Sequence, residues 1–244
     1  MKKRCIALIL TVLMFIGGVP AFAESCPLPE PNTDVEIKFP GIEWYTDYID
    51  TLVEAEKKGI NVYDKYTCFF EDYEKRTPHW PVLFDEGHWG SEKGCGGFIL
   101  FSRDRQVPDL AGYKVYCLDL YLMYDQNVGR AADFKQPGAV QFYLGQYLFW
   151  NKDLNIQVAY EELLLKLKNI YGDNPETGYS EDHECDYAIW VNKEGALVGL
   201  SKNEYFMYLT YMAPGAEERL CQLEEKIEAD VIAAVKDFES RNQL

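Results

Sequence analysis

Histidine is scarce in this 244-residue chain, which has only His79, His88 and His183. A catalytic triad usually needs a histidine base, and many metal sites need histidine ligands, so both have few residues to draw on. The chain also lacks the G-x-S-x-G nucleophile elbow, the H-E-x-x-H zinc helix and the Lys-Ser/Thr end of a phosphate loop. We therefore predict no catalytic residue and no cofactor.

Positive charge is also scarce. The chain has 24 Lys and Arg against 40 Asp and Glu, a formal charge of -16 at pH 7. Proteins that bind nucleic acid need clustered Lys and Arg to displace counterions, so we predict no nucleic-acid partner. An anionic membrane surface is disfavoured for the same reason. A well-solvated acidic surface is the simplest reading of this composition.

Long apolar runs occur only at the start of the chain. Basic residues 2–4 precede an apolar stretch, Ile6 to Val19, and Ala21-Phe22-Ala23 has the small-x-small pattern of a signal-peptidase site. The stretch has about 14 residues, short of the roughly 20 that span a bilayer. We predict that residues 1–23 are a cleaved signal peptide and that the mature chain, with a formal charge of -19, is secreted or stays in the periplasm or cell envelope without membrane insertion. Lipidation of Cys26 is the alternative, although Glu24 stands where a lipobox has small residues.

Cysteines are few and widely spaced. No C-x-x-C is present, which argues against a thioredoxin-type redox pair and a zinc knuckle. Removing the leader takes away Cys5 and leaves an even set of six, which favours disulfides in an oxidising compartment. We prefer a bridge between Cys68 and Cys95, because it would close the base of a long Gly- and Pro-rich loop; buried free thiols remain the alternative. The disulfide candidates are Cys26, Cys68, Cys95, Cys117, Cys185 and Cys221.

Two clusters combine types of metal ligand. Asp85, Glu86 and His88 lie in one loop with His79 and Cys95, and residues 181–186 hold four carboxylates beside a histidine. Neither has the spacing of a known metal helix. Because acidic turns are usually solvated, we assign no metal to either cluster.

The periodicity of apolar residues predicts an α+β fold. Helical spacing occurs over 45–59, over 160–172 and again after Pro214-Gly215, and alternation or short apolar runs mark the strands. The order predicts an antiparallel sheet with helices packed mainly on one face. We predict a flexible lead-in over 24–40 and a single α+β domain over 41–244, and the two helix-then-strand halves are compatible with a diverged duplication. The predicted strands cover residues 65–70, 97–102, 113–124, 140–150, 185–191, 196–201 and 205–212.

Aromatic residues are abundant, with 18 Tyr, 13 Phe and 5 Trp. Several lie on strand positions opposite the inferred core. If exposed, such rings suit protein or carbohydrate recognition; if helices cover both sheet faces, they are core residues. Both readings stay open. The candidate ligand-binding residues are Tyr113, Tyr121, Tyr143, Tyr147 and Phe149.

These observations favour an extracytoplasmic binding or interaction module, with a protein or a carbohydrate at the cell envelope as its partner. The alternative is a secreted hydrolase that depends on carboxylates. Its candidates are Asp119, which interrupts an aromatic strand face, and the loop with Asp85, Glu86 and His88.

Three segments carry a resemblance: Phe39-Pro40-Gly41-Ile42-Glu43-Trp44 before a helix, Tyr160 to Gly172 with its Tyr-Gly ending, and Trp190 followed by a hairpin over 200–211. The layout resembles uncharacterised exported α+β proteins of anaerobic bacteria, a group that implies no activity or binding residues. The later segments are similar to helix-plus-sheet modules of outer-membrane assembly lipoproteins, although the lipobox is missing.

Overall fold

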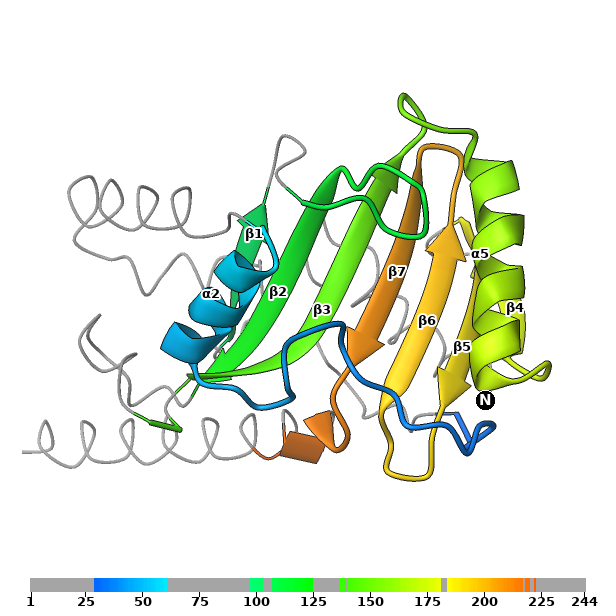
Figure 1. The fold of residues 1–244 in the computed structure, drawn as a ribbon. Coiled ribbons are helices and arrows are strands. Elements are labelled where there is room, and N and C mark those ends of the chain that lie inside the picture. Colours follow the sequence, from blue (N-terminus) through cyan, green and yellow to red (C-terminus); the bar gives the residue numbers. More distant parts are fainter. Residues whose placement is uncertain are drawn as a thin grey trace, which may run out of the picture.

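The structure is a computed structural model, and it describes residues 29–60, 97–102, 107–124, 137–138, 140–180, 184–216, 218–219 and 222. Figure 1 shows the helices and the twisted sheet of this part of the chain. The elements are α2 (Tyr48–Lys57), β1 (Gly97–Ser102), β2 (Cys117–Tyr124), β3 (Val140–Trp150), α5 (Ile156–Tyr171), β4 (Glu176–Ser180), β5 (Cys185–Val191), β6 (Leu197–Lys202) and β7 (Phe206–Met212).

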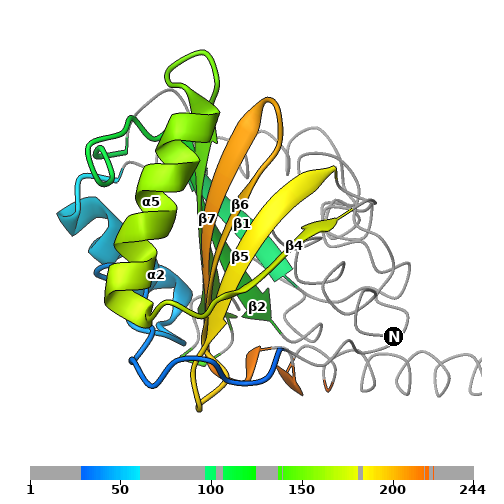
Figure 2. The same ribbon diagram turned by 90° about the vertical axis from the view of Figure 1, so that its right-hand side faces the viewer.

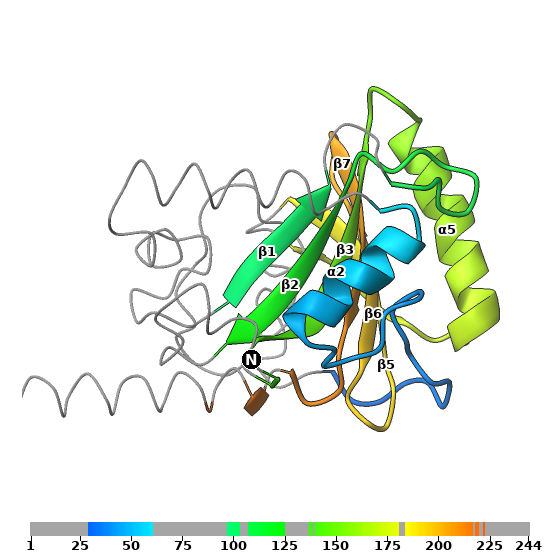
Figure 3. The same ribbon diagram turned by 60° about the vertical axis from the view of Figure 1, so that its left-hand side comes forward.

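The seven strands form one antiparallel sheet in the order β1-β2-β3-β7-β6-β5-β4. A helix followed by a meander therefore occurs twice along the chain, and the two meanders meet through their last strands, β3 and β7. Both helices lie on the same face of the sheet, α2 against β3 and α5 against β6 and β7 (Figures 2 and 3). The predicted α+β fold with helices on one face is confirmed.

The ends of α5 are set by the residues that flank it, Asn155 before the helix and Gly172 after it. The side chain of Asn155 accepts a hydrogen bond from Val158 N at 3.2 Å, so α5 begins four residues before the predicted start at Tyr160. The helix ends at Gly172, whose φ of 106° is open to glycine at little cost. Its buried stripe faces the sheet and comprises Ile156, Ala159, Tyr160, Leu163, Leu167 and Tyr171.

The lead-in packs on the sheet over most of its described length. Asn32 Nδ2 donates to Ile189 O at 3.0 Å, and Asn32 Oδ1 accepts from Val191 N at 2.9 Å. Further along, Ile37 and Phe39 are buried in the core between the sheet and the helices. In Figure 1 this blue segment runs from β5 across the sheet towards α2. The described part of the lead-in thus belongs to the domain and is not a free tether.

A β-bulge in β3 changes which side chains share a face. Tyr121 pairs with Leu144 whereas Leu122 pairs with Phe142, so Tyr143 has no partner in β2. The regular alternation assumed from the sequence therefore shifts in the middle of β3. Beyond the bulge, odd-numbered residues of β3 face the helices.

Other departures from the predicted elements are local. The strand predicted over 113–124 begins only at Cys117, and β4 was not predicted. The strand predicted over 65–70 and most of the helix predicted after residue 215 lie outside the described residues. Within the described ranges, no helix is long and apolar enough to cross a membrane.

No disulfide is seen at two of the candidates. Cys117 and Cys185 are buried, and neither is bonded to another cysteine. They cannot bridge each other, because three strands separate β2 from β5 and neighbouring strands lie about 4.8 Å apart, whereas a disulfide needs Cα atoms within about 7 Å. Cys26, Cys68, Cys95 and Cys221 lie outside the described residues, so the preferred Cys68–Cys95 bridge stays a prediction.

Candidate functional site

The sequence left open whether the aromatic strand residues form an exposed face or belong to the core. In the described structure, four of the five candidate rings are buried. Tyr121, Tyr143, Tyr147 and Phe149 are at most 5% exposed. The bulge also divides them, since Tyr147 and Phe149 lie in the core beneath the helices whereas Tyr121 and Tyr143 lie in a second core on the opposite face. These four rings are core residues, the second of those two possibilities.

Tyr113, the fifth candidate, is partly exposed and tied to α5. Its hydroxyl donates to the carboxylate of Glu162, which raises the pKa of Tyr113. Lys166 Nζ lies 5.8 Å from the centre of the Tyr113 ring and donates to Ala111 O at 2.9 Å. This ring therefore holds the loop before β2 against the helix.

Asp119 lies on the sheet face opposite the helices, in register with Gln146 of β3. Gln146 Nε2 donates to Thr210 Oγ1 at 2.9 Å, and both side chains are buried. Burial, followed by the charge of Asp119, raises the pKa of Tyr121 well above its usual value. Asp119 thus belongs to a polar band across the second core, and it does not line the open pocket described below.

The clusters that combine metal-ligand types fall mostly outside the structure. His79, Asp85, Glu86, His88 and residues 181–183 lie outside the described residues. Among the residues that are described, no group of three or more His, Cys, Asp or Glu is placed to hold a metal ion.

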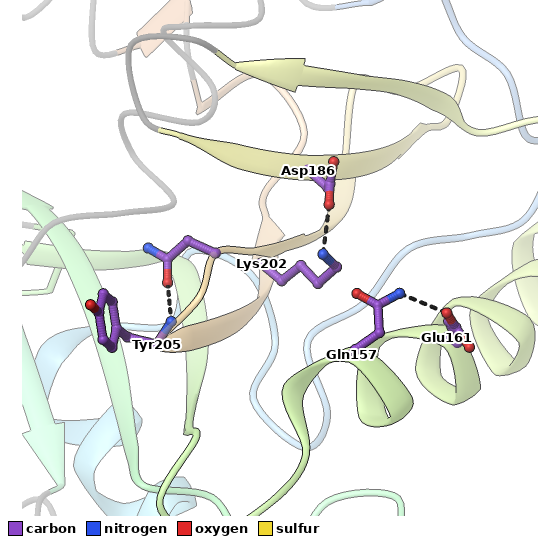
Figure 4. A network of polar contacts seen from close by, with 6 residues as sticks. Gln157, Glu161, Asp186, Lys202 and Tyr205 are labelled. Carbon is purple, nitrogen blue, oxygen red and sulfur yellow. Dashed lines mark hydrogen bonds and ion pairs between the residues drawn. The ribbon is translucent and has the colours of Figure 1, made fainter.

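The open pocket lies at the rim of the sheet where β3 and β6 end. We call it the rim pocket; it has a volume of about 690 Å³ and is lined by residues 151–157, which join β3 to α5, and by residues 202–204, which begin the turn into β7. Figure 4 shows several polar residues of this region. Two connections far apart in sequence therefore build one site.

Hydrogen bonds to the backbone fix these two connections. Asn151 N donates to Tyr205 O at 2.9 Å, and Asn151 Nδ2 donates to Glu204 O at 3.3 Å, so the connections are bonded to each other. Asn203 Oδ1 accepts from Tyr205 N at 2.9 Å and from Phe206 N at 2.8 Å, which shapes the turn. The pocket is therefore a fixed feature of the sheet rim.

Lys202 forms the inner wall of the rim pocket. Its side chain is only 14% exposed, and its ammonium pairs with Asp186 Oδ2 at 2.6 Å (Figure 4). The same ammonium lies 5.3 Å from the centre of the Tyr160 ring. Burial, with smaller contributions from Asp186 and Cys185, raises the pKa of Tyr160 to about 12. A neutral phenol and an ion pair thus support this wall.

The outer wall carries exposed polar side chains. Lys152, Gln157 and Glu204 are exposed, and Gln157 Nε2 donates to Glu161 Oε1 at 2.6 Å. Charged groups of both signs line the pocket in equal number, since Lys152 and Lys202 are matched by Asp153 and Glu204. The lining residues therefore carry no formal net charge in a chain whose net charge is -16, and Asp186, which pairs with Lys202, adds one negative charge just outside the lining.

Aromatic rings stand beside the rim pocket. Trp150, the last residue of β3, packs edge-on against Tyr116 at 4.9 Å and stacks with Phe206 at 6.4 Å between ring centres. Lys152 Nζ lies 4.1 Å from the centre of the Trp150 ring. Tyr205, next to Glu204 in the turn, is 54% exposed. Trp150 and Tyr205 each adjoin a pocket residue in sequence, but neither ring lines the pocket.

The rim pocket was not predicted from the sequence. Its residues belong to two polar turns, and polar turns are ordinary features of loops. The only signal was the density of Asn in them, with Asn151, Asn155 and Asn203.

Comparison with protein-family models, with curated proteins and with solved structures finds no match. The resemblance stated from the sequence therefore stays a prediction.

Proposed function

We propose that this protein is an extracytoplasmic binding module that holds a small, uncharged, hydroxyl-rich ligand, a saccharide, in the rim pocket. The observation that carries the proposal is a polar pocket of about 690 Å³ whose lining residues carry no formal net charge in a strongly acidic chain. An uncharged ligand does not need a net charge in its site, and its hydroxyls can bond to amide, carboxylate and ammonium groups.

The lining groups suit such a ligand. Gln157 offers both a donor and an acceptor, Glu204 offers acceptors and Lys152 offers donors, and all three are exposed at the pocket. Export through the leader predicted at residues 1–23 would bring the pocket to saccharides outside the cytoplasm.

Titration calorimetry with a panel of neutral mono- and disaccharides tests the proposal. We expect at least one sugar to bind, and Gln157→Ala to weaken it about tenfold because a hydrogen bond at the pocket is lost. Gln222→Ala is the matched control: Gln222 is also exposed and also bonds a glutamate four residues away, Glu218, but it does not line the pocket. If no sugar binds, or if both variants lose affinity equally, the proposal fails.

A second function is favoured by one observation: two carboxylates, Asp153 and Glu204, line the same pocket. A hydrolase of glycosidic bonds needs such a pair, one as acid and one as base or nucleophile. Release of reducing ends from a bound oligosaccharide, abolished by Glu204→Gln while binding persists, would identify a hydrolase. Binding without turnover favours the module.

A further inference from the structure

The outer edge of β4 is open. β4 is the last strand of the sheet, beyond β5, and no described strand pairs with its other side (Figure 2). Its three central residues, Thr177, Gly178 and Tyr179, are exposed, and Tyr179 is 59% exposed. An exposed edge offers N–H and C=O groups to which another strand can add.

Hydrogen bonds of β5 show which residues of β4 face outward. Asn192 N donates to Ala196 O on the β6 side, whereas Ile189 O and Val191 N bond to Asn32 on the other side. Because bonding directions alternate along a strand, the odd-numbered residues of β5 bond towards β4. Their partners in register are Glu176, Gly178 and Ser180, so the N–H and C=O groups of Thr177 and Tyr179 point away from the sheet.

The lead-in covers the end of β5 that extends beyond β4, but no described strand covers β4 itself. Where β5 extends beyond β4, Asn32 N donates to Val191 O at 2.9 Å and the Asn32 side chain fills the adjacent positions. β4 itself carries neither the lysine nor the proline that commonly protects an edge. Tyr187 lies across Gly178, where a Cβ would be 2.2 Å from the Tyr187 hydroxyl, so this position of the edge strand has no room for a larger side chain.

The surroundings of β4 are acidic. Among the described residues from 173 to 186, none is Lys or Arg, and four are acidic: Asp173, Glu176, Glu184 and Asp186. Asp173 and Glu184 are exposed and Glu176 is partly exposed. A second copy of the chain would bring the same acidic residues against these, which disfavours pairing of two β4 strands. A basic strand would be attracted instead.

We propose that the β4 edge is a docking site for an extended, lysine- or arginine-rich segment of a partner protein, which adds to the sheet as a further strand. The outward groups of Thr177 and Tyr179 bond the backbone of that segment, and the acidic residues around β4 select its charge. This surface is independent of the rim pocket, so either site can fail without the other.

Fluorescence anisotropy with short capped peptides that alternate valine with lysine, or valine with glutamate, tests the proposal. The lysine peptide should bind at least about tenfold more tightly than the glutamate peptide, and its affinity should fall as salt rises. Thr177→Pro removes an outward N–H without breaking a bond to β5 and should weaken binding about tenfold, whereas Thr177→Ser should not.

Two further measurements keep the test decisive if Thr177→Pro does not fold. Glu176→Gln combined with Glu184→Gln should weaken binding of the lysine peptide and should not weaken binding of the glutamate peptide. In the unaltered protein, hydrogen exchange of the Thr177 and Tyr179 amides should slow when the lysine peptide binds, while the Gly178 amide is already protected by β5. Absence of binding, equal affinity for both peptides, unchanged affinity in the folded Thr177→Pro variant, or a dimer that this variant abolishes would each overturn the proposal.

Discussion

At the scale of single residues, Gly145 shows how one missing side chain makes room for the core. It lies buried in the middle of β3, and a Cβ there would be 2.2 Å from Cε2 of Phe39. The Phe39 ring stacks on Tyr147 at 5.6 Å and meets Phe142 edge-on at 5.2 Å between ring centres. The lead-in can therefore insert its phenylalanine only because position 145 has no side chain.

Gly145→Ala should lower the free energy of unfolding by about 1 to 3 kcal/mol, because the added methyl group pushes a packed ring out of place. Urea unfolding followed by far-ultraviolet circular dichroism measures the change. Phe39→Leu in the same background should recover part of the loss, since the smaller side chain leaves space for the methyl group. A purely additive double-mutant cycle would show that the Phe39 contact is not the cause.

At the scale of elements, the lead-in acts as an additional edge piece of the sheet. The Asn32 side chain uses both its donor and its acceptor, on Ile189 O and Val191 N, and the backbone N–H groups of Asn32 and Thr33 both reach Val191 O. Trp44 Nε1 donates to Ile37 O at 3.1 Å, which fixes the far end of the segment. Polar contacts thus hold the segment at Asn32 and Ile37, and Phe39 anchors it in the core just beyond Ile37.

Asn32→Ala should destabilise the protein by about 1 to 3 kcal/mol, because it leaves backbone groups of β5 without their side-chain partner. Hydrogen exchange should become faster over residues 32–39 and at Val191, and by more there than in α5. Asn32→Asp keeps the acceptor for Val191 N, so its stability and its exchange rates should lie between those of the unaltered protein and those of Asn32→Ala. Equal exchange in all three proteins would mean that the backbone contacts alone hold the lead-in.

Most helices and strands could be predicted because their buried residues recur at a regular period. The period of α5 is clear from Leu163, Leu167 and Tyr171, but its true start depends on the cap at Asn155, which lies outside the apolar stripe. β4 was missed because its residues are mainly exposed and show no apolar alternation. The bulge at Tyr143 could not be predicted, since the alternation it interrupts continues in sequence on both sides.

At the scale of the whole molecule, the aromatic excess is explained by a sheet that is buried on both faces. Phe142, Tyr147 and Phe149 fill one core, and Tyr121 and Tyr143 fill the other. Composition alone could not distinguish this from an exposed recognition face, because both use rings on alternate strand positions. The rim pocket escaped prediction for another reason: its two turns lie about 50 residues apart in sequence and meet only through the pairing of β3 with β7.

Burial of so many ionisable side chains also sets a limit on alkaline stability. Burial, followed by the charge of Asp186, raises the pKa of the Cys185 thiol from 9.0 to about 12, and burial raises the pKa of Tyr160 from 10.0 to about 12. Burial likewise raises the pKa of Tyr147 and Tyr208. The folded state therefore holds these protons more tightly than the unfolded state, so their contribution to stability is complete below pH 9 and is lost as the pH rises towards 12.

We expect the urea midpoint to be nearly constant from pH 7 to about pH 9 and then to fall steeply up to pH 12, with tyrosinate absorbance rising at the same pH as the loss of circular dichroism. Cys185→Ala removes the group whose ordinary pKa is lowest, so its midpoint should fall less between pH 9 and pH 10 than that of the unaltered protein, whatever its stability at neutral pH. Cys117→Ala, which removes a second buried cysteine of the described residues, separates the effect of Cys185 from that of losing any thiol. If the tyrosines instead titrate at their ordinary pKa while the fold persists, both cores are open to water and the burial described for them is wrong.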